Sequence, residues 1–600
     1  MPSPQGRLSL ATPHLSSARC TIQAHKSREE RPMAYDLVIR NGMIVDGSGL
    51  PRYRGDVGVK DGRIVTIGRI PGNGAKETID AEGHVVSPGF IDGHTHMDAQ
   101  IFWDPIGTSS CYQGVTSVVM GNCGFTLAPC RESEADLVFR NLERAEDISR
   151  AAMLAGIKWR WETFPQFLDV LESLPKGINY AGYIGHCALR TYVMGQRAFT
   201  EEASEADMKA MVHHLKEAVR AGAYGFSTTR SVNHQTSDDK PVASRLATWG
   251  EFEALVHAMG ELGTGLVEVA GEPSGADSEK AIKYYNDLAR LSASSGRPIT
   301  FGLFSRRQKP GAWRGTFDII EKAAQMGGRL FAQVHSRALN VLLSFETHLP
   351  FDKWEYWREI RALPLSEQKK ALQDPEKRRR LVEIASRPYD GPQVFGTEAR
   401  PPSWEYVYAM ETIGGPHRSM AELARQRNTH PVDVMIDMAL ERDMKFFMIQ
   451  PIANEDQSAA LELMKHPRSV VTFSDSGAHV SQIMDSSLQT HLLSHWVREK
   501  QAFTLEEAVK MITCDTATQF GFHDRGLLRE GMAADMVVFD PKTVGPQMPE
   551  VVTDLPAGAK RLRQKAHGIR ATVVNGQTLL RDNEPTGNLP GKLVRSKLPA

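Results

Sequence analysis

Two histidines separated by a single residue are the first side chains in this sequence whose types and spacing suggest chemistry. His94 and His96 stand in the run Gly-His-Thr-His. In an extended chain alternate side chains share a face, so both imidazoles point the same way. Imidazole nitrogen is a common zinc ligand, and a pair on one face could begin a metal site. An ordinary polar loop would give the same pattern, but the preceding Pro-Gly-Phe-Ile-Asp run is typical of a strand end and favours the metal site.

A cysteine and an aspartate follow two other apolar runs and extend the same chemistry. Cys123 lies in a Gly-Asn-Cys-Gly run, and a thiolate is a good ligand for a borderline-soft metal. Most free cysteines are simply buried, but the flanking glycines permit tight backbone near a site. Asp475 could bind metal and take a proton from metal-activated water. Helix capping is the alternative for Asp475, and its place after the last predicted strand favours catalysis.

Five further side chains that follow predicted strands are candidates for binding a substrate. An arginine presents a planar fork that suits a carboxylate. For the histidine after the third strand, a structural hydrogen bond is an equal alternative. For each of the other four candidates, the alternative to a binding role is an ordinary solvated loop residue. The candidates are His186, Arg230, His234, Arg245 and His479.

These residues can form one site only in a fold that brings the ends of several strands together. The middle of the chain predicts such a fold, because short apolar runs alternate there with amphipathic stretches. Apolar residues recur at helical spacing in Glu205–Ala221 and Trp249–Leu262. Such alternation indicates βα units of the α/β class, and eight units suggest a closed (β/α)8 TIM barrel, whose reactive residues stand at the carboxyl ends of the strands. The predicted strands are Val85–Ile91, Val115–Met120, Asn179–Ile184, Tyr224–Thr228, Leu266–Val269, Ile299–Leu303, Leu330–Val334 and Val470–Phe473.

Both ends of the chain carry short strands and tight turns, and neither end is large enough to make a good core alone. One small composite β-sandwich built from both termini is therefore predicted, from residues 33–86 and 525–600. We expect residues 1–32 to be a disordered leader or an over-extended start. The barrel should take residues 87–524, with an insertion at about 340–465 that is too long for one βα connection.

The composition excludes several classes of protein. The 600 residues contain 71 Lys plus Arg and 72 Asp plus Glu, so no basic excess points to nucleic acid or an anionic membrane. We find no apolar run of the ~20 residues that a membrane span needs. Six sparse cysteines argue against a disulfide scaffold and favour a reducing, cytoplasmic location. The expected partner is a small molecule, and a homo-oligomer stays open.

From Met33 almost to its end, the chain resembles the amidohydrolase superfamily, and within it the N-acyl-D-amino-acid deacylases (D-aminoacylases). The Gly-Asn-Cys-Gly run is distinctive of the deacylase branch, whereas the histidine pair marks only the superfamily. The resemblance implies a barrel with a composite β-sandwich, zinc, and hydrolysis of the amide of an acylated amino acid. It also implies His94, His96 and Asp475 at one metal position, with Cys123 as a ligand at the other. The matching segments are Ser87–His96, Gly114–Gly124, Gly185-His186, Leu189-Arg190, Gly225–Thr228, Ser474-Asp475 and Ala533–Asp535.

The chain departs from that family at the ends of strands five and six, where the deacylases each carry a metal-binding histidine. Here Ala270 and Leu303 stand at or beside those positions. That metal position is therefore lost or rebuilt, and we expect one zinc ion rather than two. Replacement ligands could come from strand five, where alternate side chains share a face, or from loops at the same end of the barrel. They are Glu268, Glu272, His335 and His234.

The hypothesis from sequence is a hydrolase of a carbon–nitrogen bond other than a peptide bond. His94, His96 and Asp475 would hold one zinc ion, with Cys123 as a further candidate ligand, and the metal would make hydroxide available near neutral pH. Asp475 would take the water proton and pass it to the leaving nitrogen. Two alternatives stay open: a cyclic-amide hydrolase like the dihydroorotases and hydantoinases, and a non-catalytic binding protein on the same scaffold. A substrate panel would discriminate the first alternative, and the metal content the second.

Overall fold

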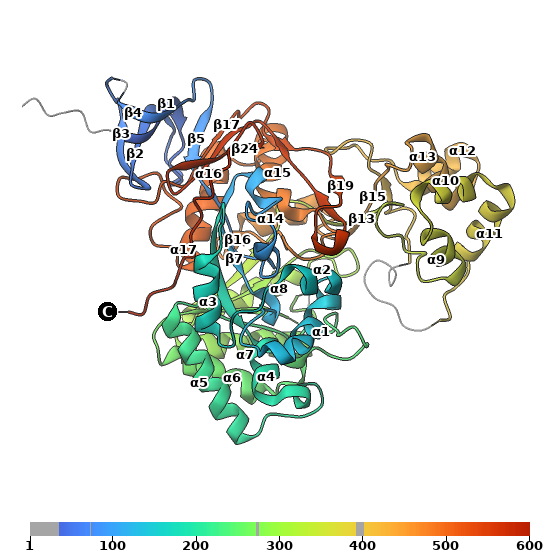
Figure 1. The fold of residues 1–600 in the computed structure, drawn as a ribbon, viewed down its shortest axis with the longest axis horizontal. Coiled ribbons are helices and arrows are strands. Elements are labelled where there is room, and N and C mark those ends of the chain that lie inside the picture. Colours follow the sequence, from blue (N-terminus) through green and yellow to red (C-terminus); the bar gives the residue numbers. More distant parts are fainter. Residues whose placement is uncertain (1–34, 73, 272–274, 392–400, 600) are drawn as a thin grey trace, which may run out of the picture.

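The computed structural model describes residues 35–72, 74–271, 275–391 and 401–599. The predicted leader, residues 1–32, and the candidate ligand Glu272 lie outside these residues. Within the described ranges, no helix is long and apolar enough to cross a bilayer. The molecule has three parts: a parallel barrel, a β-domain beside it, and a helical lobe that projects from it (Figure 1).

Eight parallel strands form the central sheet, and they follow one another around it in sequence order. Nearly all of their side chains are buried, which explains why they occur as short apolar runs in the sequence. The predicted (β/α)8 barrel is thereby confirmed. Its strands are β6 (Phe90–Asp92), β7 (Val115–Met120), β8 (Asn179–Gly185), β9 (Gly225–Thr229), β10 (Leu266–Ala270), β11 (Ile299–Gly302), β12 (Leu330–Val334) and β16 (Ser469–Val471).

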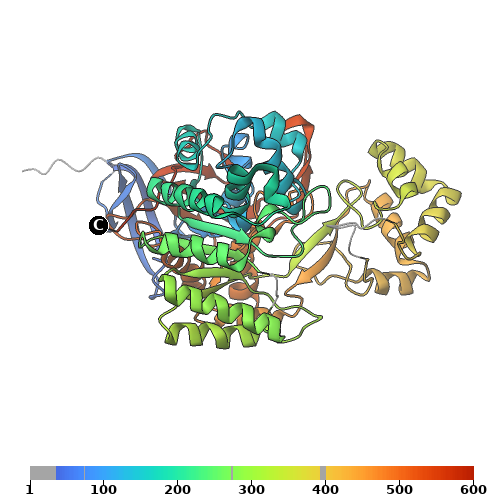
Figure 2. The ribbon, with the colours of Figure 1, turned by 90° about the horizontal axis from the view of Figure 1, so that it is seen from below.

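Helices connect the strands and cover the outside of the sheet (Figures 1 and 2). Side-chain caps set where they begin: the Ser204 hydroxyl accepts a hydrogen bond from the Asp207 N–H, and the helix that follows ends at Gly222, where φ is +114°. The helices of this part are α1 (Ala135–Ala145), α2 (Arg150–Gly156), α3 (Phe164–Ser173), α4 (His186–Met194), α5 (Glu205–Ala221), α6 (Trp249–Gly260), α7 (Glu279–Ser295), α8 (Ala312–Gln325), α14 (Gln457–Lys465), α15 (Leu488–His491), α16 (Leu505–Lys510) and α17 (Thr516–Phe520).

The first predicted strand, Val85–Ile91, serves two sheets. It divides at Gly89 into β5 (Val85–Pro88), which belongs to the β-domain, and β6 of the barrel. Gly89 suits this crossing because a Cβ there would collide with the Thr116 side chain. Both halves of the segment are fully buried, so one continuous apolar run conceals the change of sheet.

Strands from both ends of the chain build the β-domain. Hydrogen bonds join them in the order β24-β23-β22-β17-β5-β1-β2-β3, with β4 beside β1, so they form one continuous sheet. One buried cluster combines Leu37, Val57 and Val86 with Met536 and Val573, which confirms the predicted domain made by both ends. The strands are β1 (Tyr35–Ile44), β2 (Tyr53–Lys60), β3 (Arg63–Gly68), β4 (Ala75–Asp80), β17 (Met536–Phe539), β22 (Ile569–Val574), β23 (Gln577–Arg581) and β24 (Glu584–Pro585).

The described residues between 339 and 453 form the projecting part, which we call the lobe (Figures 1 and 2). It leaves the barrel after β12, and the chain returns through α14, which packs on β16. The lobe has its own hydrophobic core around Trp357, whose Nε1–H donates to the Leu381 carbonyl (3.1 Å). Its elements are β13 (Leu339–Leu343), α9 (Glu355–Arg361), α10 (Leu365–Gln373), α11 (Pro375–Ala385), β14 (Tyr408–Ala409), α12 (Met420–Arg427), α13 (Pro431–Glu441) and β15 (Met448–Ala453).

Candidate active site

The first and last barrel strands meet beyond their carboxyl ends, at a junction of residues 92–96 with residues 472–477 that we call the seam. At its base the Thr472 hydroxyl donates to the Asp92 carboxylate (2.8 Å) and accepts from the Gly93 N–H (2.7 Å). All three residues are buried. A single hydroxyl therefore pairs with both a donor and an acceptor on the facing segment, where no water can replace it.

The backbone of the seam fixes the candidate ligands against one another. The His96 N–H donates to the Ser476 carbonyl (2.8 Å), and the Asp475 N–H donates to the His94 carbonyl (3.2 Å). Gly477 makes this approach possible, because its φ is +97° and a Cβ there would collide with the His96 carbonyl. The histidine pair and Asp475 are thus held in register without depending on their side chains.

The four side chains predicted to bind a metal converge at the seam. Asp475 Oδ1 lies 3.3 Å from His94 Nε2 and 3.5 Å from His96 Nε2. Cys123, which follows β7, places its Sγ atom 3.6 Å from His94 Nε2. The two histidines and the cysteine are buried, whereas the Asp475 side chain is 17% exposed and so keeps limited contact with solvent.

The spacing of these atoms fits a tetrahedral metal ion. Zinc binds nitrogen or oxygen at about 2.0–2.1 Å and sulfur at about 2.3 Å, so two ligand atoms of one tetrahedral ion lie about 3.4–3.6 Å apart. The observed separations of 3.3, 3.5 and 3.6 Å agree with this. Glu146, whose Oε2 atom lies 3.6 Å from His96 Nε2, has a buried Oε1 atom with no hydrogen-bond partner among the described residues. Unpaired buried polar atoms are expected where an ion belongs.

Burial and mutual contact set the charges of these groups. Burial lowers the pKa of His96 to about 4 despite the neighbouring Asp475, so this imidazole is neutral at pH 7. Burial also acts to lower the pKa of His94, but the hydrogen bond with Asp475 and the charge of Glu268 outweigh it and raise that pKa. For Asp475, hydrogen bonds with both imidazoles outweigh burial and hold its pKa well below the usual value. An ionised carboxylate beside the imidazoles is the state that binds metal.

Cys123 lies in the short turn η3 (Asn122–Gly124), in a left-handed conformation with φ +56°. Its N–H donates to Glu268 Oε2 (2.6 Å), so strand five holds the cysteine loop in place. Burial raises the pKa of the thiol well above its usual value, and the charge of Glu268 adds to this. Asp475 shares the left-handed conformation, with φ +52°, and strained backbone of this kind clusters at functional sites.

The ends of strands five and six carry no histidine, as the sequence indicates: Ala270 ends β10 and Leu303 follows β11. Glu268 on β10 has Oε1 at 3.9 Å from His94 Nδ1, and burial raises its pKa to about 7 against the opposing charge of His94. His335 follows β12 and is fully buried, which lowers its pKa to about 3, and its Nε2 atom lacks a partner among the described residues. Both remain predicted replacement ligands.

His186, a predicted substrate-binding residue, uses both of its ring nitrogens within the protein. Nδ1 hydrogen-bonds with the Thr228 hydroxyl (2.9 Å), and Nε2 with the Glu251 carboxylate (2.8 Å). The same carboxylate pairs with Arg190. All of these side chains are buried, and this arrangement favours the structural interpretation of His186.

The other four substrate-binding candidates lie in loops at the carboxyl end of the barrel. Arg230 donates to the Ala247 carbonyl (3.2 Å), and Arg245 donates to the His234 carbonyl (3.1 Å). His479 follows the seam directly, and it keeps partial exposure. These residues remain candidates for contacting a substrate.

Two residues at the site were missed by sequence reasoning. Gln333 on β12 places Oε1 at 2.8 Å from His94 Nδ1, which orients the imidazole. It precedes His335 by two residues on one strand face, and that spacing could have revealed it. Glu146, the residue after α1, places Oε2 at 3.6 Å from His96 Nε2 and is 2% exposed. No signal in the sequence identifies Glu146, because it does not follow a strand.

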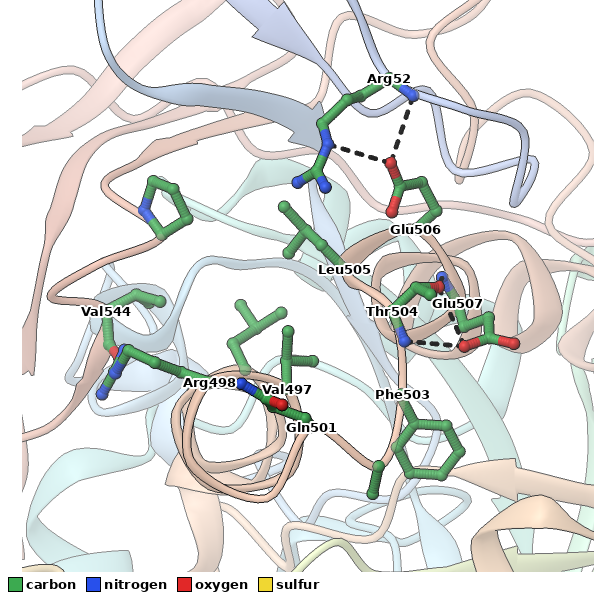
Figure 3. A pocket seen from close by; sticks show the side chains of 13 residues that line it. Arg52, Val497, Arg498, Gln501, Phe503, Thr504, Leu505, Glu506, Glu507 and Val544 are labelled. Atoms are coloured by element: carbon green, nitrogen blue, oxygen red, sulfur yellow. Dashed lines mark hydrogen bonds and ion pairs between the residues drawn. The ribbon is translucent and has the colours of Figure 1, made fainter.

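A cavity elsewhere in the protein is larger than the cavity that borders the candidate site. One cavity of about 480 Å³ lies beside α16, where Arg52 pairs with Glu506 (3.2 Å), and none of the four predicted metal ligands lines it (Figure 3). Asp475 instead borders a cavity of about 20 Å³ together with Ser474 and Ser476. That volume is large enough for about one water molecule.

Buried imidazoles, a thiol and carboxylates at the carboxyl end of a parallel barrel are the features of a metal-dependent hydrolase. The model of the amidohydrolase family matches residues 77–580, and the chain belongs to this family. A second model, of the urease alpha-subunit N-terminal domain, matches residues 17–89. The predicted class, a hydrolase acting on carbon–nitrogen bonds other than peptide bonds, is confirmed.

Individual relatives are similar over nearly the whole chain. A D-aminoacylase of Alcaligenes xylosoxydans xylosoxydans is 27% identical over 582 residues, covering 93% of this chain and 97% of the relative. An N-acyl-D-aspartate deacylase of the same organism is 27% identical over 570 residues, with 94% and 96% covered. Among solved structures, an N-acyl-D-glutamate deacylase from Bordetella bronchiseptica, complexed with zinc and a phosphonate inhibitor, has a TM-score of 0.63 at 24% identity, with 94% of this chain and 100% of that chain covered. That likeness shows a shared fold.

Proposed function

We propose that the protein removes the acyl group from an N-acyl-D-amino acid, with zinc as its metal. The observation that carries the proposal is the convergence of two imidazoles, a thiol and a carboxylate at the seam, in spacings that suit one tetrahedral ion. The similarity to a D-aminoacylase over nearly the full length of both chains supports the substrate class.

The residues of the site divide the chemistry between them. His94, His96 and Asp475 would hold a divalent metal, with Cys123 as a further candidate ligand, and the metal would supply the Lewis acidity that polarises an amide carbonyl and makes hydroxide available near neutral pH. Asp475, the carboxylate that follows the last barrel strand, accepts the proton of the attacking water and delivers it to the leaving nitrogen. Gln333 holds the His94 ring in its orientation.

Contact with the substrate's carboxylate is assigned to Arg230, Arg245 or His479, whose loops stand at the same end of the barrel. We also propose a cytoplasmic protein that acts on a small molecule. We propose the same domain boundaries as the sequence predicts: the β-domain comprises residues 33–86 and 525–600, and the barrel comprises residues 87–524.

The test is hydrolysis of matched N-acetyl-D- and N-acetyl-L-amino acids by the zinc-loaded protein. We expect turnover of the D series, and Asp475→Asn should lower kcat about 10²–10⁴-fold. Zinc content measured on the same samples separates loss of the base from loss of metal. Asp456→Asn is the matched control, because an asparagine caps α14 as well as the native aspartate does. Full activity of Asp475→Asn, or of metal-free protein, would refute the scheme.

A cyclic amide is the second candidate substrate. A D-hydantoinase of Ralstonia pickettii is 43% identical over 123 residues, which cover 20% of this chain and 25% of that relative. The same site chemistry would open a cyclic amide. Turnover of a hydantoin without turnover of any N-acyl-D-amino acid would replace the first proposal with this one.

A further inference from the structure

A second group of potential metal ligands lies next to the first and shares one member with it. Cys123, Glu146 and His234 each offer one ligand atom, and these atoms lie within 4.8 Å of one another. They come from three separate segments: the turn after β7, the end of α1 and the loop after β9. None of them belongs to strand five or six.

Glu146 is a buried carboxyl group whose contacts among the described residues include no full positive charge. Its side chain is 2% exposed, and its Oε1 atom has no hydrogen-bond partner among the described residues. Its Oε2 atom lies 3.6 Å from His96 Nε2 and 3.7 Å from His479 Nε2. Within the described part of the chain, no lysine or arginine forms an ion pair with it. A buried carboxyl group without a full positive partner either keeps its proton or binds a cation, and metal coordination is the second of these two states.

The fold holds both new ligands in place. The carbonyl of Glu146 accepts the His479 N–H (2.6 Å), which ties the end of α1 to the seam. His234 Nδ1 hydrogen-bonds with the Thr229 hydroxyl (2.7 Å), so its Nε2 atom is the nitrogen left for a ligand. Arg245 donates to the His234 carbonyl (3.1 Å) and fixes that loop. A ligand imidazole whose other nitrogen is hydrogen-bonded is the usual arrangement at metal sites.

We propose that Cys123, Glu146 and His234 form a second metal position, with the Cys123 thiolate shared between the two ions. It provides, from loop residues, the position that Ala270 and Leu303 cannot provide at the ends of strands five and six. One sulfur, one nitrogen and one carboxylate oxygen suit a borderline divalent ion such as zinc. The inference rests on the proposed function only for the first metal position, and it revises the expectation of a single ion.

The experiment measures the number of zinc ions per chain in the full-length protein. The protein is dialysed against a low zinc concentration, and its zinc content is then determined by inductively coupled plasma mass spectrometry. We expect about two zinc ions per chain in the native protein and about one in each of the variants Glu146→Gln and His234→Asn. Glu143→Gln, one turn earlier on α1, and His257→Asn on α6 are matched controls that should keep the native count. A native count of about one, or variants that keep the native count, would overturn the proposal.

Anomalous diffraction from crystals of the native zinc-loaded protein gives a result that does not depend on how the variants fold. We expect a second zinc peak at about 2.0–2.3 Å from the Cys123 sulfur and from side-chain atoms of Glu146 and His234. A single peak between His94 and His96, or a second peak beside Glu268 or His335, would overturn the proposal. Either of these results would overturn the second metal position without contradicting the proposed deacylation. A failure to hydrolyse any N-acyl-D-amino acid would contradict the deacylation without changing the zinc count.

Discussion

Replacing Thr472 with valine tests whether the seam depends on one buried hydroxyl. Valine has nearly the shape of threonine, so the packing is retained while the hydroxyl is lost. That hydroxyl donates to the Asp92 carboxylate (2.8 Å) and accepts from the Gly93 N–H (2.7 Å). The variant therefore removes two hydrogen bonds from the junction that holds the candidate ligands.

The free-energy cost of the substitution follows from the hydrogen bonds that Asp92 and Gly93 keep after the hydroxyl is lost. Asp92 still accepts from the His94 N–H (3.1 Å) and the Phe473 N–H (3.4 Å), so it loses one charge-assisted bond, worth about 1.5–3 kcal/mol. The Gly93 N–H is left buried without an acceptor, at a cost of about 1–3 kcal/mol. The seam should therefore open more easily by about 2.5–6 kcal/mol, or roughly 60- to 20,000-fold at 1.4 kcal/mol per factor of ten.

Hydrogen–deuterium exchange followed by mass spectrometry measures this directly. Peptides covering residues 90–97 and 470–478 should exchange at least roughly 60-fold faster in Thr472→Val, while peptides of α13 in the lobe keep the native rate. Thr472→Ser retains the hydroxyl and should stay close to native. Native exchange rates at the seam in Thr472→Val would refute the reasoning, because the hydroxyl would then not hold the two segments together.

Three further predictions follow from the site and the lobe. Zinc binding should release protons, because a raised pKa keeps the Cys123 thiol protonated at pH 7 and the pKa of His94 is raised as well, whereas His96 with a pKa of about 4 is already neutral. Zinc affinity should therefore rise with pH, and calorimetry showing no proton release would contradict this. Gln333→Met should weaken zinc binding about 10–100-fold in chelator competition by releasing the His94 ring, and an unchanged affinity would argue against that orienting bond. Trp357→Ala should destabilise the lobe by about 3–5 kcal/mol, seen as faster proteolysis there, with zinc content as the control that stays native.

Much of the barrel and part of the site could be predicted from the sequence because both follow local rules. Short buried strands leave apolar runs, and ligands that directly follow a strand, such as His94, Cys123 and Asp475, inherit their position from it. The change of sheet at Gly89 could not be predicted, because burial is equally complete on either side. Glu146 could not be predicted either, since a helix end reaches the site only through the packing of the whole chain.

The strand shared between the two sheets has a consequence for how the protein is made. β5 pairs with β17, with Pro88 opposite Met536, so the sheet edge that leads into the first barrel strand stays uncovered until the far end of the chain arrives. At about 5–20 residues per second, a ribosome needs roughly 20–90 seconds to add the approximately 450 residues between these partners. The segment that carries the first two ligands therefore spends most of synthesis beside a strand with one unpaired edge, and such an edge is open to wrong pairing or to a chaperone.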